Sequence, residues 1–198
     1  MQPTTAHSLG KKILLEIWDI VKFLLPIVIV VFVVRTFIAQ PFIVDGDSSY
    51  PNFRTGHYLI IDELSYRFKE PARGDVIVLR YPLQPSRFFL KRIIGLPGDR
   101  VVIKDGKVFI YNAENPKGYV LSEPYQDQPT FPTGPYQDTL LGSGDYFVMG
   151  DNRGGSDDSR TWGILPRKDI MGHVILRLFP LKLMGITPAS VDDFAQVK

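Results

Sequence analysis

Residues 87–99 read Arg-Phe-Phe-Leu-Lys-Arg-Ile-Ile-Gly-Leu-Pro-Gly-Asp, an aromatic and β-branched run that ends in a turn signal. The run predicts a strand over Phe88–Ile94. Because side chains of a strand alternate between its faces, Lys91 shares a face with Phe89 and Ile93. Burial there would lower the pKa of Lys91, and a neutral lysine amine is a general base that can activate a serine. The alternative is a lysine that reaches from a strand edge into water.

Short β-like runs continue along the chain on both sides of this strand. An Asp-Gly pair at 105–106 separates two of them and predicts a hairpin. No long helical pattern appears after residue 40, so we expect a mostly β fold, with an antiparallel β domain over residues 40–187 and a C-terminal tail over 188–198. The runs are Tyr58–Ile61, Val76–Leu79, Val101–Ile103, Val108–Ile110, Tyr146–Met149 and Val174–Leu176.

Residues 111–145 differ in amino-acid composition from the rest of this domain. They are rich in proline and tyrosine, and the tetrapeptide Pro-Tyr-Gln-Asp occurs at 124–127 and again at 135–138. Two copies do not make a repeat protein. We interpret the segment as a small inserted lobe.

Composition excludes several classes of protein. The chain has 198 residues with 44% hydrophobic residues, enough for a packed core, so global disorder is excluded. Its 23 basic and 21 acidic residues leave a net charge of +2, which argues against a nucleic-acid partner held by bulk charge. The absence of cysteine excludes disulfides, thiolate metal sites and a cysteine nucleophile.

An apolar stretch near the N-terminus is typical of a membrane segment. Residues 23–34 carry no charge, and residues 20–39 have the usual length of a spanning helix, about 20 residues. The lysines before this stretch favour a cytoplasmic N-terminus; they are Lys11, Lys12 and Lys22. We therefore expect a cytoplasmic segment over 1–12 and a single transmembrane helix within 13–39, whose membrane core is 20–39.

Two other interpretations of this stretch stay open. A cleaved signal peptide fits the basic residues and the apolar run, but the residues up to Ala39 offer no small residue at the −3 position of a cleavage site. A buried helix of a soluble domain conflicts with the scarcity of polar residues. We favour an uncleaved signal anchor, with everything after residue 40 on the far side of the membrane.

Two further segments are dense in reactive or polar side chains. Residues 45–51, Asp-Gly-Asp-Ser-Ser-Tyr-Pro, place a small hydroxyl residue in a tight turn, and a plain polar turn is the alternative. Residues 150–160, Gly-Asp-Asn-Arg-Gly-Gly-Ser-Asp-Asp-Ser-Arg, suggest a polar network or a calcium loop, but Trp162 stands where an EF-hand needs its last carboxylate. A Ser-His-Asp triad would have to use His57 or His173. Either is more simply interpreted as a surface or strand histidine without a catalytic role.

The three segments, in this order behind one signal anchor, resemble the bacterial type I signal peptidases. The family's G-x-S-M-x-P pattern stands here as Gly46 to Pro51, its base segment as Lys91 to Asp99, and its last box as Gly150 to Arg153 with Ser156, Asp158, Ser159 and Arg160. The resemblance covers about residues 13–187.

This resemblance implies a membrane-anchored serine endopeptidase that removes signal peptides from exported preproteins. Ser48 would be the nucleophile and Lys91 the general base, with Ser156, Asp158 and Arg160 in supporting roles. The substrate pocket would be lined by Val44, Ser49, Phe89 and Leu90. The family needs neither a metal nor an organic cofactor. Its partners are signal peptides, the lipid bilayer and, by extension, the translocation machinery; its location is the plasma membrane, with the catalytic domain on the extracytoplasmic face.

The chain departs from the family at Ser49, where the family has Met. Gly46 also lacks the hydroxyl that some members place there as a second oxyanion donor, so only the Ser48 N–H is assigned to that role. Two rival functions remain: a membrane-anchored binding protein that kept the fold and lost turnover, and an autoproteolytic repressor. The repressor would need a DNA-binding domain where the chain has its apolar segment.

Overall fold

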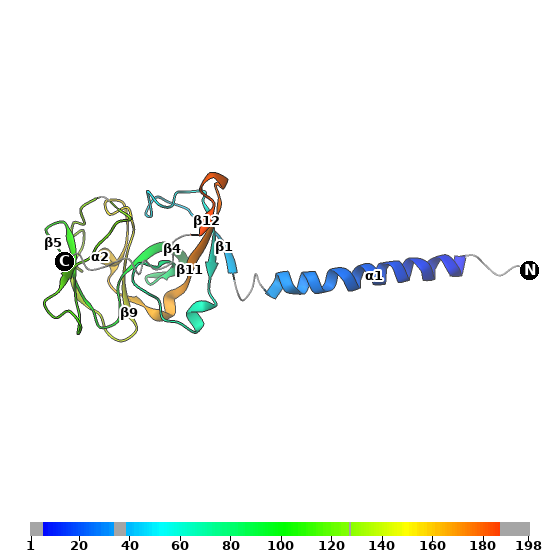
Figure 1. Cartoon of the computed structure of the whole chain (residues 1–198), viewed down its shortest axis with the longest axis horizontal. Helices are drawn as coiled ribbons and strands as arrows, with labels where there is room; N and C mark the ends of the chain where they lie inside the picture. Colours follow the sequence, from blue (N-terminus) through cyan, green and yellow to red (C-terminus); the bar gives the residue numbers. More distant parts are fainter. Residues whose placement is uncertain (1–5, 34–38, 127, 187–198) are drawn as a thin grey trace, which may run out of the picture. The chain divides into compact units, whose positions relative to one another are not determined.

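The computed structural model describes residues 6–33, 39–126 and 128–186, so part of the predicted span and the predicted tail lie outside the described residues. The chain separates into two compact units, residues 1–39 and 40–198, and each is taken by itself (Figure 1).

The N-terminal unit contains one helix, α1 (Ala6–Val33), with Pro26 inside it. Its apolar side chains from Phe23 to Phe32 are exposed. Glu16, Asp19 and Lys22 interrupt the apolar character of the helix before Phe23. Within the described ranges, no helix meets the length and hydropathy expected of a membrane span. The predicted transmembrane helix is therefore not confirmed, and residues 34–38 of its expected core are not described.

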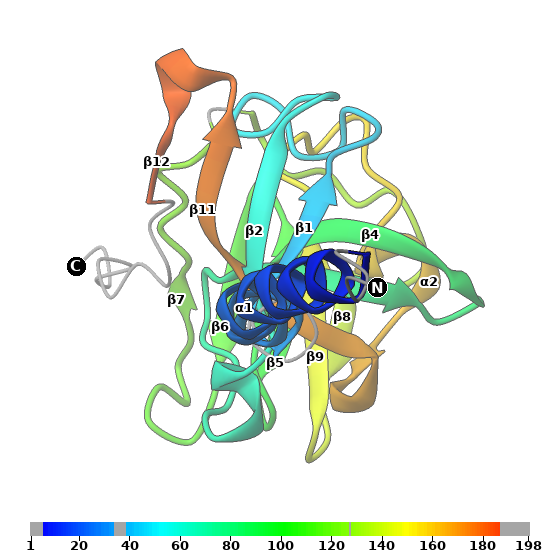
Figure 2. The same cartoon turned by 90° about the vertical axis from the view of Figure 1, so that its right-hand side faces the viewer.

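The second unit confirms the expected antiparallel β architecture. Its larger sheet has the order β1-β2-β11-β3-β4-β9-β10, and β12 pairs with β11. Figure 2 shows β1, β2 and β11 side by side. The strands are β1 (Ala39–Ile43), β2 (Tyr58–Asp62), β3 (Val76–Tyr81), β4 (Gln84–Gly95), β9 (Asp145–Met149), β10 (Leu165–Pro166), β11 (Ile170–Phe179) and β12 (Gly185–Ile186).

A smaller sheet of order β7-β6-β5-β8 lies at the opposite end of this unit from β1 (Figure 1). It consists of β5 (Arg100–Lys104), β6 (Lys107–Tyr111), β7 (Tyr119–Val120) and β8 (Asp138–Leu140). The predicted Asp-Gly hairpin joins β5 to β6, and both turn residues, Asp105 and Gly106, have positive φ. The sheet thus begins before residue 111, because this hairpin pairs with β8 from the proline-rich segment.

Strand β4 joins the apolar cores of the two sheets. Ile93 packs in one buried cluster and Ile94 in another, because adjacent residues of the strand face opposite sides. Gly95 ends the strand where an added Cβ would lie 2.5 Å from Val101 Cγ2 and 2.7 Å from Leu141 Cδ1. Helical structure after β1 is limited, among the described residues, to α2 (Ser159–Trp162) and three 3₁₀ turns at Ser65–Arg67, Arg167–Asp169 and Leu181–Leu183.

Candidate active site

Lys91 lies in the middle of the large sheet and is almost fully buried. Its partner in the adjacent strand β3 is Ile77, and its side chain is 3% exposed. Lys91 Nζ donates to Ser156 Oγ at 3.1 Å and lies 5.2 Å from the centre of the Phe89 ring. Burial lowers the pKa of Lys91 to about 8, against the opposing effect of the Asp158 and Asp157 carboxylates. A substantial fraction of the amine is therefore neutral near pH 8.

Ser48 lies in a turn, residues 45–51, that follows β1 and that we call the serine turn. Backbone hydrogen bonds close its loop, from Val44 N to His57 O at 3.0 Å and from Gly56 N to Val44 O at 2.9 Å. Gly46 has φ of +95°, a conformation that favours glycine. Within the described residues, the Ser48 N–H and Oγ donate to no protein acceptor. Both groups are therefore available to a substrate.

Ser49, next to Ser48, has a different environment. It is 3% exposed, and its Oγ donates to the Leu90 carbonyl at 3.1 Å. The hydroxyl thus ties the serine turn to the residue before Lys91 in β4. A buried hydroxyl that is already hydrogen-bonded is poorly placed to attack a substrate, which favours Ser48 as the reactive serine.

The glycine-rich loop, residues 150–160, is hydrogen-bonded to the serine turn. Asn152 donates twice to it, from its backbone N to Ser48 O at 3.0 Å and from Nδ2 to Asp47 O at 3.1 Å. An added Cβ at Gly150 would lie 2.3 Å from both Ser48 O and Ser156 Oγ. Glycine is therefore required at position 150, where the Ser48 carbonyl and the Ser156 hydroxyl pack against the same Cα.

Two buried ion pairs set the shape of this loop. Asp158 accepts from Arg160 Nε and Nη2, both at 2.8 Å, and from Gly150 N at 3.1 Å. Asp151 accepts bidentately from Arg92 of β4, at 2.8 Å for each bond. Such pairs hold one geometry strongly, because removing one partner leaves an uncompensated buried charge.

A small pocket of about 70 Å³ opens beside Ser48. Apart from Ser48 and Asp45 its lining residues are apolar, and they come from β1, the segment that follows β1, and β4. The lining residues are Phe42, Ile43, Val44, Asp45, Ser48, Phe88, Phe89 and Leu90. A pocket of this size accommodates a small side chain and excludes a large one.

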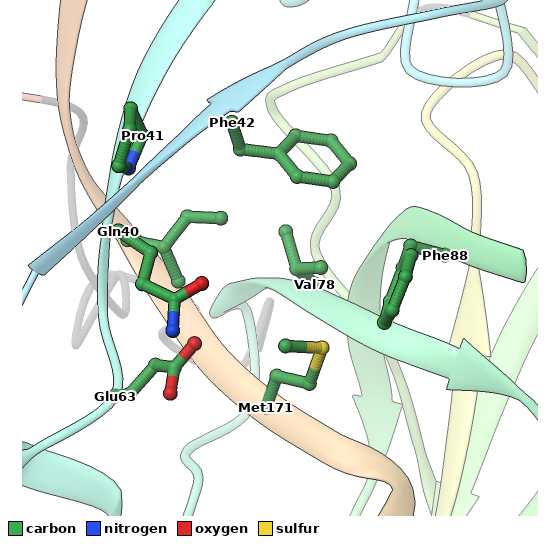
Figure 3. Close-up of a pocket in the computed structure, with 8 residues that line it drawn as sticks. Gln40, Pro41, Phe42, Glu63, Val78, Phe88 and Met171 are labelled. Carbon is green, nitrogen blue, oxygen red and sulfur yellow. The ribbon is translucent and has the colours of Figure 1, made fainter. Parts of the chain in front are cut away.

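A second pocket of about 110 Å³ adjoins the first, since Phe42 and Phe88 line both. Figure 3 shows Phe42, Val78, Phe88 and Met171 around it, with the polar ends of Gln40 and Glu63 directed toward the same end. Burial raises the pKa of Glu63. The two pockets together form a mainly apolar trough between β1 and β4, to which β2, β3 and β11 contribute Ile61, Val78 and Met171.

The structure brings most of the predicted site residues together. Lys91, Asp158 and Arg160 are buried, with the half-buried Ser156 bonded to Lys91, and Val44, Phe89 and Leu90 line the pocket beside Ser48. Ser49 is not among the lining residues of that pocket. Within the described part of the chain, Ser48 and Lys91 are not hydrogen-bonded to each other, a contact that often tightens only with substrate.

Several residues of the site were not predicted from the sequence. Arg92 of residues 87–99 forms an ion pair with Asp151 of residues 150–160, and the opposite charges of the two residues were the one hint of this pair in the sequence. Asn52 donates to Asp151 at 2.8 Å, from a position just after the serine turn. No described group of three or more His, Asp or Glu side chains is arranged to hold a metal ion.

Comparison with known proteins decides the family. The profile of the family described as "Signal peptidase, peptidase S26" matches residues 17–179. The chain belongs to the signal peptidase family, peptidase S26. It is therefore a serine peptidase.

Individual signal peptidases are similar over most of the chain. A probable signal peptidase I-1 of Synechocystis sp. is 34% identical, over 85% of this chain and 87% of the relative. A signal peptidase I of Leptolyngbya laminosa is 35% identical, over 77% of this chain and 74% of the relative. A crystal structure of a signal peptidase I from Enterococcus faecalis V583 is 31% identical, with a TM-score of 0.43 over 53% of this chain and 97% of that chain.

Gly150 provides a direct test of how closely the glycine-rich loop must approach the serine turn. Gly150→Ala should lower the peptidase kcat/KM by about 100-fold or more, because the added methyl group displaces the Ser48 carbonyl or the Ser156 hydroxyl. The matched control is Gly154→Ala in the same loop, where the nearest atom to an added Cβ is 4.0 Å away. Equal activity of the two variants would contradict this geometry.

Proposed function

We propose that the chain is a membrane-anchored signal peptidase in which Ser48 is the nucleophile and Lys91 the general base. The observation that carries this proposal is the burial of Lys91 Nζ against Ser156, with a pKa lowered to about 8, beside a serine turn whose Ser48 hydroxyl is unengaged in the described structure. A lysine in water is a poor base at neutral pH because nearly all of it is protonated.

In the first half of the reaction, Ser48 Oγ attacks the carbonyl carbon of the scissile peptide bond. Neutral Lys91 accepts the hydroxyl proton, and the Ser48 backbone N–H stabilises the negative charge that develops on the carbonyl oxygen. Lys91 then delivers the proton to the departing amine as the C–N bond breaks. An ester between Ser48 and the signal peptide remains.

In the second half, Lys91, neutral again, removes a proton from a water molecule that attacks the ester. The C–O bond to Ser48 breaks, and the proton returns from Lys91 to Ser48 Oγ. Ser156 holds the amine in place throughout, and Asp158 with Arg160 maintains the loop that carries Ser156. This is the serine–lysine variant of the catalytic triad.

The trough between β1 and β4 suits an extended signal peptide. The pocket beside Ser48 would take the small residue just before the cleaved bond. Alternate side chains of an extended chain point the same way, so the residue two positions earlier would enter the adjoining pocket of Phe42, Val78 and Met171. Val44, Phe89 and Leu90 would exclude large side chains at the first position.

The N-terminal segment would anchor the enzyme in the plasma membrane. The apolar residues 20–39 have the length of a spanning helix, and the lysines before them favour a cytoplasmic N-terminus. The catalytic domain would then lie on the extracytoplasmic face, where cleavage sites emerge after translocation. Anchoring would keep the site close to the membrane-bound signal peptide and raise its effective concentration.

Substitution of the two adjacent serines tests the assignment of the nucleophile. Ser48→Ala should abolish cleavage of a preprotein with an Ala-x-Ala site. Ser49→Ala should retain much of the activity, because only the hydrogen bond to Leu90 O is lost. Lys91→Arg should also be inactive, since a guanidinium does not deprotonate in a protein. Sequencing of the new N-terminus identifies the cut, and the reverse order of the serine variants would exclude Ser48.

The pH dependence of kcat/KM tests the general base in the free enzyme. Because the neutral form of Lys91 is the active one and its pKa is about 8, kcat/KM should rise with pH and level off above pH 8. Well below that pH, each unit should lower the rate about tenfold as the amine becomes protonated. A profile that is flat from about pH 6 to 9 would be incompatible with Lys91 as the base.

A further inference from the structure

One short segment of the inserted lobe (residues 111–145), residues 123–125, contacts the residues that surround the candidate active site. In that segment the Tyr125 carbonyl accepts from Asn52 Nδ2 at 2.8 Å, and the same nitrogen donates to Asp151 Oδ2 at 2.8 Å. Asp151 in turn holds Arg92, which follows the base lysine in β4. Hydrogen bonds thus join the lobe to Asn52, the residue after the serine turn, and through Asp151 to Arg92 of β4.

A second connection runs from Glu123 of the same segment. Its carboxylate pairs with the Arg153 guanidinium, and the two side chains are 8% and 1% exposed. Arg153 Nε donates to the Gly150 carbonyl at 3.2 Å. Gly150 is the residue whose Cα packs against Ser48 O and Ser156 Oγ. One buried cation, Arg153, therefore links Glu123 to Gly150.

The Tyr125 side chain links the two connections. Its ring lies 4.0 Å from the Arg92 guanidinium carbon and 5.9 Å from that of Arg153, and its hydroxyl donates to Glu123 Oε1 at 2.7 Å. Two buried arginines are thus matched by two carboxylates, Asp151 and Glu123, around one aromatic ring. Cations stacked on an aromatic face are attracted to it most strongly where water is excluded.

We propose that residues 123–125 of the lobe are a positioning element for catalysis. Glu123 acts through Arg153 and the Tyr125 carbonyl acts through Asn52, and together they hold Gly150 and the serine turn in register with Lys91. This inference rests on the proposed roles of Ser48 and Lys91. It gives the lobe a part in turnover, beyond its contribution to the fold.

The test measures kcat, KM, pH dependence and thermal stability of three full-length variants. Glu123→Gln removes the buried charge at constant size, Asn52→Ala removes the other connection without altering the lobe, and Glu114→Gln is the matched control at an exposed lobe glutamate. Each variant is assayed well below its own Tm, so that only folded enzyme contributes. Should Glu123→Gln fail to fold, Asn52→Ala alone decides the outcome.

We expect kcat to fall about tenfold in Glu123→Gln and in Asn52→Ala, with KM within about twofold of the wild type. The charges that act on Lys91 are those of Asp158, Asp157, Arg160 and Asp151. In Glu123→Gln, Arg153 loses its carboxylate partner, adds positive potential near Lys91 and competes for Asp151. The pH at which the enzyme reaches half of its maximal rate should therefore move to a lower value.

A purely structural role predicts a different pattern. The Tm would fall, while kcat of the folded enzyme and the midpoint of the pH profile would match those of Glu114→Gln; that result overturns the inference and leaves the proposed function intact. A wild-type enzyme that cleaves no preprotein would contradict the proposed function, and the inference with it. Cleavage by the wild type but not by Ser48→Ala in the same assay separates the two outcomes.

Discussion

Burial of one amine, that of Lys91, is the constraint on which the rest of the site depends. An ammonium ion in the middle of a sheet is costly, so the neutral form is favoured and the pKa falls to about 8. The carboxylates nearby would restore the charge if they paired with Lys91 directly. Asp158 and Asp151 are instead paired with Arg160 and Arg92, which leaves the amine to the Ser156 hydroxyl.

Two of the buried arginines therefore serve the proposed chemistry as well as the fold. Arg92 and Arg160 each neutralise a carboxylate that would otherwise hold Lys91 protonated, and Arg92 also joins segments that are far apart in the sequence. Arg92 connects β4 to the glycine-rich loop, and Arg160 donates to the Arg153 carbonyl within that loop. Because such pairs tolerate little rearrangement, the distance between serine turn and base is set by rigid contacts.

Local signals predicted seven of the strands and the Asp-Gly hairpin, since alternation and turn chemistry are properties of neighbouring residues. The short strands β1, β7, β8, β10 and β12 were not predicted. The site was predictable only as separate segments, and the resemblance to a known family joined them. What remained hidden depends on long-range contacts: the pairing of Arg92 with Asp151, the buried hydrogen bond of Ser49, and the approach of Glu123 to Arg153. Ser49 was expected in the pocket, but its hydroxyl points to a backbone carbonyl that no local pattern reveals.

Direct titration of the Lys91 side chain tests the central claim most directly. With lysine labelled at the ε-carbon, NMR spectra would be followed from about pH 6 to 11, and Lys91→Arg would identify the resonance by its absence. We predict that this one resonance titrates near pH 8. If it titrates near 10.4, as lysine does in water, the amine is protonated at neutral pH and the proposed base chemistry is wrong.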